Sequence, residues 1–288
     1  MSKRVVVCGD DFGMNADVDE GMIALAGVGR VSAVSCLTLG PTFAANAPRL
    51  AALDVDIGLH LNLSETLSAG AEPMPALGAL ILKAYAGLLD AAWVEAQLVR
   101  QFDAFEAVFG RAPDYVDGHE HVHQLPGIRQ RLLALMARRY GTQAGAQAPW
   151  LRQTAPGMQC GMPLKESVKA RVIGALGASA LAREARSSGL RTNRRLLGVY
   201  AFDGGKRRYA HFLQTWLFNA REGDLVMCHP ALGSERGSAM ARQRRAEFDV
   251  LADPRLGEWL RANGVSITRL ALTHAEPVLP VAARAIPA

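Results

Sequence analysis

An apolar run at residues 5–8, followed by Gly9 and the acid pair Asp10 and Asp11, constrains this chain more than any other stretch. A short apolar run of this kind is typical of a buried strand. Two carboxylates at the end of such a strand are costly unless something compensates their charge, because unpaired buried charges are unfavourable. The rest of the chain must therefore supply a cation, a metal ion or a set of hydrogen-bond donors.

Strands and helices alternate along the chain. Asn15 is expected to cap a helix at 16–28, since Asn is a favoured N-cap residue. Further strands are expected at 31–39, 55–63, 115–119, 196–200, 224–228 and 265–271, with a short one near 150–152. Further helices are expected at 42–53, 79–89, 91–109, 127–139, 164–187, 209–220, 239–252 and 255–263. This alternation predicts parallel βα units, and thus an α/β fold.

The length of 288 residues permits one large domain, and the chain shows neither a repeat nor a clean linker. We expect a single domain at 1–275 and a flexible tail at 276–288, which is rich in Ala and Pro. The loop at 64–78, rich in Gly, Pro, Ser and Ala, follows a strand and is long enough to indicate a functional role.

Composition narrows the functional classes. The net charge is +5, and the short Arg runs at 138–139, 194–195 and 244–245 are interpreted as solvated helix faces, because no aromatic residues are interleaved with them. A nucleic-acid groove is therefore not expected. The four cysteines are widely separated, which fits a reducing cytoplasm without a disulfide framework. The N-terminal apolar run is too short for a signal peptide, and no apolar stretch of transmembrane length follows it, so we expect a cytoplasmic protein.

Four polar sites follow expected strands: the acid pair Asp10 and Asp11, then His60, His119 and His229. In parallel sheets and barrels, the carboxyl ends of the strands form the ligand-binding end. Asp and His side chains that converge there from separate strands suit a divalent metal with open coordination positions.

Three of the seven histidines occupy alternate positions, His119, His121 and His123. In an extended segment they would share one face, which favours a metal or phosphate site. Because Pro126 begins a helix, the extended segment is expected to end soon after His121. His119 is then the best ligand of the three, while His121 and His123 are expected to support a ligand or contact substrate.

Several neighbours are candidates for supporting roles. Asp117 is placed to orient a ligand or an acid catalyst. Asn62 shares a strand face with His60, which on its own would more often be a core histidine. Arg152 is expected from its loop position either to contact substrate or to pair with the acids. His229 ends a strand, and an imidazole with a near-neutral pKa is a natural general acid.

Four motifs occur in a fixed order. They are Asp-Asp-Phe-Gly at 10–13, Gly-Leu-His-Leu at 58–61, Asp-Gly-His-Glu-His-Val-His at 117–123 and Met-Cys-His-Pro at 227–230. Each motif is weak alone, but the ordered set resembles the YdjC-like carbohydrate deacetylases. That family includes chitooligosaccharide deacetylases and deacetylases associated with hopanoid biosynthesis. The resemblance extends from about Arg4 to beyond Pro230.

The resemblance implies a distorted (β/α) barrel, similar to a TIM barrel and related to the polysaccharide deacetylases. It implies one divalent metal ion (Zn, Mg or Mn) held by Asp11, His60 and His119. It also implies Asp10 as the catalytic base and His229 as the acid. The activity it implies is metal-assisted hydrolysis of an N-acetyl group on an N-acetylglucosamine-containing carbohydrate or glycolipid, with release of acetate.

Two other functions stay open on the residues alone. A metal-dependent phosphoesterase also uses His-x-His at a strand end, but it needs further ligands for a second ion. A non-catalytic sugar-binding module would bind its ligand without releasing acetate. The expected partner is a small carbohydrate or glycolipid, and a homodimer is compatible with the sequence. Segment 141–195 is longer than in the shorter family members, so substrate contacts are expected to differ there.

Overall fold

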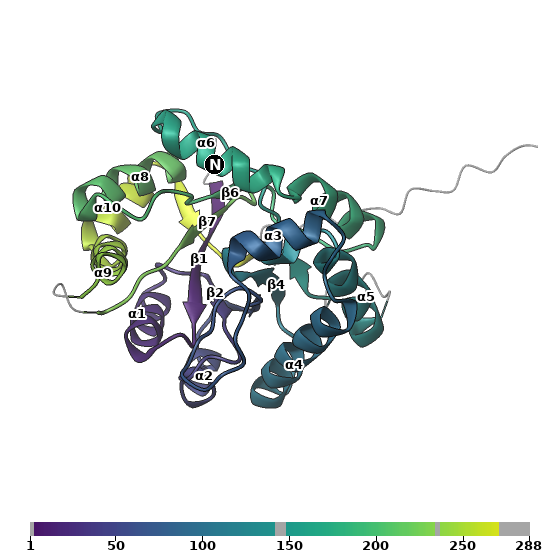
Figure 1. The fold of residues 1–288 in the computed structure, drawn as a ribbon. Helices are drawn as coiled ribbons and strands as arrows, with labels where there is room; N and C mark the ends of the chain where they lie inside the picture. The colour runs from purple at the N-terminus through teal and green to yellow at the C-terminus, as the bar shows by residue number, and fades with distance from the viewer. Residues whose placement is uncertain (1–2, 142–147, 234–236, 271–288) are drawn as a thin grey trace, which may run out of the picture.

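The computed structural model describes residues 3–141, 148–233 and 237–270 (Figure 1). Within these ranges eight parallel strands form one sheet in the order β5-β4-β3-β2-β1-β7-β6, with β8 paired to β1 off this path. The strands are β1 (Lys3–Phe12), β2 (Ala33–Cys36), β3 (Asp56–Leu61), β4 (Tyr115–Gly118), β5 (Trp150–Leu151), β6 (Leu196–Leu197), β7 (Leu225–Cys228) and β8 (Val265–Ile267).

Helices surround the strands, as Figure 1 shows. They are α1 (Ala16–Gly27), α2 (Phe43–Ala51), α3 (Leu77–Tyr85), α4 (Ala91–Phe109), α5 (Ile128–Tyr140), α6 (Leu164–Ala175), α7 (Ala178–Ser187), α8 (Gly205–Asn219), α9 (Ala239–Ala252) and α10 (Pro254–Ala262), with the 3-10 turn η1 (His119–Gln124) after β4. The expected Asn15 cap of α1 is confirmed, because its side chain accepts a hydrogen bond from the Val18 amide. None of the described helices combines the length and the apolar character needed to cross a lipid bilayer.

The sheet curls into an open, distorted barrel. The segments that contain β5 and β6, at opposite ends of the strand order, meet through two isolated parallel bridges, Leu151 with Thr192 and Pro156 with Leu196. The expected α/β barrel architecture is confirmed by this arrangement. All carboxyl ends of the parallel strands consequently point to one end of the barrel.

β1 is the central strand and pairs with β2, β7 and β8. Its apolar residues are fully buried, as expected for a strand that is covered on both faces. Near its end the register with β2 shifts between Gly9 and Phe12, and Asp11 has a left-handed backbone with φ of 80°. Adjacent residues of a regular strand point to opposite faces. The irregularity lets Asp10 and Asp11 line the same cavity.

The segment after β4 differs from expectation. β4 ends at Gly118, and Glu120 and His121 in η1 have left-handed backbones, with φ of 51° and 61°. The expected extended segment to about His121 is therefore wrong, because the chain already turns at Glu120. Gly118 permits this turn, since a Cβ there would lie 2.9 Å from Nδ1 of His123, which folds back against it.

The expected single helix at 164–187 is two helices, α6 and α7. Gly177 separates them with φ of 138°, a backbone conformation that side chains with a Cβ rarely adopt. The expected flexible tail at 276–288 lies outside the described residues.

Candidate active site

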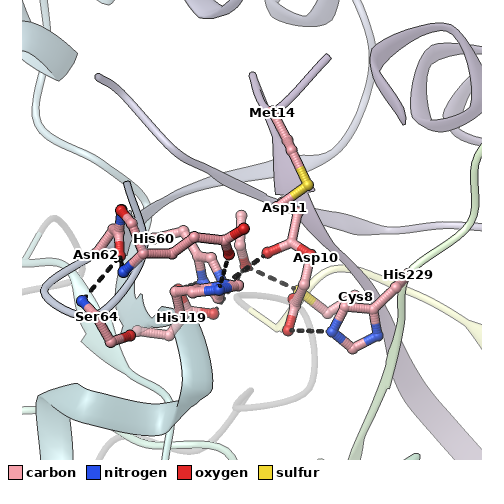
Figure 2. A network of polar contacts seen from close by, with 12 residues as sticks. Cys8, Asp10, Asp11, Met14, His60, Asn62, Ser64, His119 and His229 are labelled. Carbon is pink, nitrogen blue, oxygen red and sulfur yellow. Dashed lines mark hydrogen bonds and ion pairs between the residues drawn. The ribbon is translucent and has the colours of Figure 1, made fainter. Parts of the chain in front are cut away.

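A cavity of about 660 Å³ opens at the carboxyl ends of the strands. Asp10 and Asp11 reach it from β1, His60 from β3, His119 from the turn after β4, and His229 from the residue after β7. Figure 2 shows these side chains directed toward one another. The structure therefore brings together the candidate residues that sequence analysis placed at separate strand ends.

Asp11, His60 and His119 form the group best suited to hold a metal ion. One potential ligand atom from each lies within 4.8 Å of the others. Oδ1 of Asp11 lies 2.9 Å from Nδ1 of His119 and 3.4 Å from Nε2 of His60. One carboxylate oxygen and two imidazole nitrogens are a common donor set for a divalent ion that keeps open positions.

Carboxylates hold the opposite nitrogens of both rings. Nδ1 of His60 lies 2.6 Å from Asp117, and Nε2 of His119 lies 2.7 Å from Glu65. Such partners fix ring orientation and raise the basicity of metal-binding histidines. Arg244 pairs with Oδ2 of Asp11, so Oδ1 remains directed at the two histidines. These contacts fit a metal centre, and the contact of Asp117 with His60 is compatible with the orienting role expected for Asp117.

The electrostatics of this group favour added positive charge. Burial lowers the pKa of His60, but Asp117 and Asp11 outweigh it and raise that pKa to about 9. Burial likewise lowers the pKa of His119, yet Asp11 and Glu65 raise it to about 10. Burial raises the pKa of the Asp11 carboxyl, whereas Arg244 and His119 hold it well below its usual range. The carboxylates thus attract protons or a metal cation to the same place.

Asp10 is paired with a buried arginine. Arg152 directly follows β5, has no exposed side-chain surface, and donates through both terminal nitrogens to the two Asp10 oxygens, with Nη1 at 2.6 Å from Oδ2. Burial raises the pKa of Asp10, but the Arg152 charge outweighs it and keeps that pKa below its usual range. Of the two roles expected for Arg152, the structure shows the pairing with the acids.

Arg152 also occupies a second group of potential metal ligands. Cys8, Asp10 and Asp117 offer ligand atoms within 4.8 Å of one another. Nη2 of Arg152 lies 3.1 Å from Sγ of Cys8 and 2.5 Å from Oδ2 of Asp117. The guanidinium therefore already supplies the positive charge that these groups require.

His229 lies beside Asp10, with its Nε2 at 3.9 Å from Oδ2. Its ring packs edge-on against Phe202, at a centroid distance of 4.7 Å, and its backbone amide donates to Glu247 at 2.6 Å. Burial lowers the pKa of His229 to about 4. The imidazole is consequently neutral in the free protein at physiological pH.

The other two histidines of the motif have different surroundings. His121 lines the cavity, and its Nδ1 has no hydrogen-bond partner among the described residues. His123 is fully buried, and its Nε2 lies 2.7 Å from the carbonyl oxygen of Arg152. His121 is therefore the one placed to meet a ligand, whereas His123 supports the segment after β5.

Asn62 shapes the loop that follows β3. Its Oδ1 accepts hydrogen bonds from the amides of Ser64 and Glu65, and its Nδ2 donates to the Glu65 carbonyl at 2.6 Å. These bonds hold Glu65 near His119. Asn62 thus influences the site indirectly, because it positions Glu65 in this loop.

Sequence analysis missed three residues of the site: Glu65, Arg244 and Glu247. Glu65 lies in the loop at 64–78 that was expected to be functional, so that loop was the available signal. Arg244 belongs to an arginine run interpreted as a solvated face, which is wrong for this residue, because its side chain is only 11% exposed and pairs with Asp11. No sequence signal indicated Glu247.

Comparisons with known proteins show which family the chain resembles. A family model described as YdjC-like protein matches residues 4–262. A mouse (Mus musculus) protein named carbohydrate deacetylase is 30% identical, over 92% of this chain and 93% of its own. A protein of Enterobacter sp. (strain 638) named chitooligosaccharide deacetylase is 28% identical, over 89% of this chain and 93% of its own.

A crystal structure from Enterococcus faecalis V583, named for a proposed role in cellobiose-phosphate cleavage, superimposes with a TM-score of 0.64 at 19% identity. It covers 94% of this chain and 98% of its own. An uncharacterized Agrobacterium tumefaciens C58 protein superimposes with a TM-score of 0.54 at 11% identity, over 94% of this chain and 89% of its own. These two likenesses support the fold alone.

Proposed function

This chain belongs to the YdjC-like family, and on that basis we propose that it is a metal-dependent carbohydrate N-deacetylase. The substrate is an N-acetylglucosamine-containing carbohydrate or glycolipid, and the products are acetate and a free amine. The relatives named as carbohydrate and chitooligosaccharide deacetylases support this activity. The observation that carries the proposal is the joint placement of Asp11, two carboxylate-held histidines and the ion-paired Asp10 in one cavity.

Asp11, His60 and His119 would hold one divalent ion, with Zn, Mg and Mn all compatible with this donor set. When bound, such an ion supplies Lewis-acid chemistry, by activating water and polarising the acetyl carbonyl. Asp117 and Glu65 keep the imidazole rings in position, and Arg244 keeps Asp11 turned toward them.

Asp10 is the proposed base. Its pairing with Arg152 keeps the carboxylate ionised, so it accepts a proton from the attacking water as the carbon–oxygen bond forms. His229 is the proposed acid. Because it is neutral in the free protein, it takes up a proton during turnover, and Asp10 at 3.9 Å is the nearby source. His229 then protonates the nitrogen as the carbon–nitrogen bond breaks, since an unprotonated amine is a poor leaving group.

The cavity suits a substrate with polar and apolar parts. The catalytic residues line one part of it. An apolar wall is contributed by Leu77 and Ile81 of α3, Ile173 of α6 and Leu176 just after α6. A sugar placed at Asp10 would leave room for an apolar group along these helices, which supports the glycolipid form of the proposal. His121, which lines the cavity, is the proposed contact to a sugar hydroxyl.

The phosphoesterase alternative is disfavoured by one observation. Two-metal phosphoesterases need a second ligand set, and the nearby group of Cys8, Asp10 and Asp117 is occupied by the Arg152 guanidinium. Elemental analysis that finds two ions per chain would restore that alternative.

The decisive experiment measures acetate. The purified full chain, supplied separately with Zn, Mg and Mn, is incubated with di-N-acetylchitobiose and with lipid-linked N-acetylglucosamine compounds. We expect acetate release that a chelator abolishes and added metal restores. A metal-replete protein that releases no acetate from any of these compounds would disprove the proposed activity.

Asp10→Asn separates an enzyme from a sugar-binding module. The variant keeps the shape of the side chain but cannot accept the proton, so we expect kcat to fall by about 10²–10⁴-fold with metal content unchanged. His60→Ala and His119→Ala are expected instead to lower metal content. If Asp10→Asn retained wild-type kcat, Asp10 would not be the base.

A further inference from the structure

Helix α6 exposes an apolar stripe to solvent. It buries Glu166, Ser167 and Ala170 on its other face. Its exposed face carries Leu164 (77% exposed), Val168 (46%) and Val172 (56%). At 3.6 residues per turn these three positions fall within about 80° of the helix circumference. Contiguous exposed apolar residues of this kind mark an interaction site more often than isolated ones do.

Helix α3 adds a second exposed apolar group. Leu82 and Tyr85, three residues apart on the helix, are 71% and 53% exposed, and Leu88 just beyond its end is 71% exposed. Both helices also line the catalytic cavity, through Ile81 of α3 and Ile173 of α6. In each helix a residue adjacent to the one that lines the cavity is exposed: Leu82 follows Ile81, and Val172 precedes Ile173. The exposed apolar residues of α3 and α6 therefore adjoin residues that line the cavity. Figure 1 shows α6 along the upper edge of the molecule and α3 below it, across the strands.

Positive charges border this apolar surface. On α6, the exposed Arg171 lies on one side of the stripe, and the exposed Lys165 lies on the other. On α3, the exposed Lys83 follows Leu82 directly. Asp203 lies 3.9 Å from Lys165 and 2.8 Å from Arg208, so its negative charge is shared between two cations. The chain as a whole carries a net charge of +5.

We propose that the exposed faces of α3 and α6 form a docking surface for an anionic lipid bilayer. The apolar side chains would enter the headgroup boundary, and Lys83, Lys165 and Arg171 would contact acidic headgroups. The catalytic cavity then opens beside the membrane surface, where a lipid-linked sugar would present its head. Docking is a binding property, so it stands or falls separately from the proposed deacetylation.

Charge favours a bilayer over a second copy of the chain as the occupant. In a two-fold symmetric dimer the same patch meets itself, so the cations bordering one stripe would face those of the other. Like charges brought together at an interface oppose association. An anionic bilayer instead supplies the opposite charge across the whole surface.

Co-sedimentation of the full chain with vesicles tests the proposal. We expect binding to vesicles of phosphatidylcholine mixed with phosphatidylglycerol, and much weaker binding to phosphatidylcholine alone. The triple variant Leu164→Ser, Val168→Ser, Val172→Ser should bind the anionic vesicles about ten-fold more weakly. The double variant Lys165→Gln, Arg171→Gln should lose most of the preference for anionic lipid.

Val28→Ser is the matched control. Val28 is 65% exposed but lies at the end of α1, away from the cavity, so this variant should bind as the wild type does. Far-ultraviolet circular dichroism and thermal unfolding of each variant show that its fold is intact. Failure of the wild-type protein to bind anionic vesicles would overturn the proposal. A second outcome would also overturn it: light scattering shows that the wild type is a dimer and the triple variant a monomer, while both bind vesicles equally well.

Discussion

At the scale of single residues, the site depends on charge compensation inside the barrel. Asp10, Asp11 and Asp117 are almost fully buried, and each meets at least one cationic or imidazole partner. Arg152 serves two of them and is itself fully buried. Breaking such a network by removing one partner is more harmful than removing a surface ion pair, because the remaining charge stays buried.

Arg152→Met tests this compensation. The substitution leaves Asp10 and Asp117 without their shared cation, so the free energy of unfolding should fall by about 3–5 kcal/mol. Arg100→Met, which breaks the exposed pair with Glu72, is the control and should cost less than about 1 kcal/mol. Urea unfolding at neutral pH measures both. Equal effects of the two substitutions would contradict the buried network.

Glu247 provides a pH-dependent prediction. Burial raises its pKa to about 7, although hydrogen bonds from the Tyr200 hydroxyl and the His229 amide partly offset this rise. The folded state therefore binds more protons than the unfolded state between about pH 4.5 and 7. In this window the contribution of Glu247 to stability falls as pH rises, by roughly 3 kcal/mol in total.

Glu247→Gln removes this titration while keeping a hydrogen-bonding side chain. The difference in unfolding free energy, variant minus wild type, should increase from pH 4.5 to pH 7. Denaturant titrations at several pH values measure it. A difference that stays constant across this range would show that the carboxyl group is not shifted upward.

At the scale of elements, turns decide which motif residues reach the cavity. The η1 turn directs His119 and His121 to the cavity and places His123 behind it. Gly118 makes the turn possible because His123 occupies the space that a Cβ would need. The strained left-handed backbones of Glu120 and His121 follow from the same turn.

Gly118→Ala should therefore disturb the site more than the addition of a single methyl group suggests. The added Cβ would lie 2.9 Å from Nδ1 of His123, so we expect a loss of about 1–3 kcal/mol of stability and weaker metal binding through displaced His119. Gly78→Ala in α3 is the control, since a Cβ there meets nothing within 4 Å and should stabilise by up to about 1 kcal/mol. Thermal unfolding and metal titration distinguish them. Unchanged metal affinity in Gly118→Ala would argue against the role of the turn.

Much of the element order followed from sequence, because apolar runs and the Asn15 cap are local signals. The gathering of Asp11, His60 and His119 was also predictable, since parallel strands present their carboxyl ends together. The ion pair of Arg244 with Asp11 was not predictable, because it joins residues 233 positions apart and depends on how α9 packs. The η1 turn was missed because alternating histidines also fit an extended segment.

At the scale of the whole molecule, the open barrel gathers side chains from distant segments around one cavity. The family match over residues 4–262 covers all of the elements that line it. Because the proposed ligands come from three different segments, metal binding should stabilise the entire fold and not one loop.

Metal removal tests this global coupling. At a free metal concentration of 100 times Kd, binding to the folded state alone adds about 2.7 kcal/mol, which corresponds to a rise in Tm of roughly 4–6 °C. We expect one ion per chain by elemental analysis and a fall in Tm of this size when a chelator is added. His60→Ala should show little further change with the chelator. If the chelator lowered the Tm of His60→Ala as much as that of the wild type, the proposed ligand set would be refuted.

The pairing of Arg152 with Asp10 also has a consequence for the order of folding. The two residues lie 142 positions apart, so their contact forms only after the chain has closed a very large loop. Until β5 pairs with the sheet, the Asp10 carboxylate must stay hydrated, because Arg152 is not yet beside it. We therefore expect the cavity to be completed late in assembly, so that a partly folded chain carries its acids without a functioning centre.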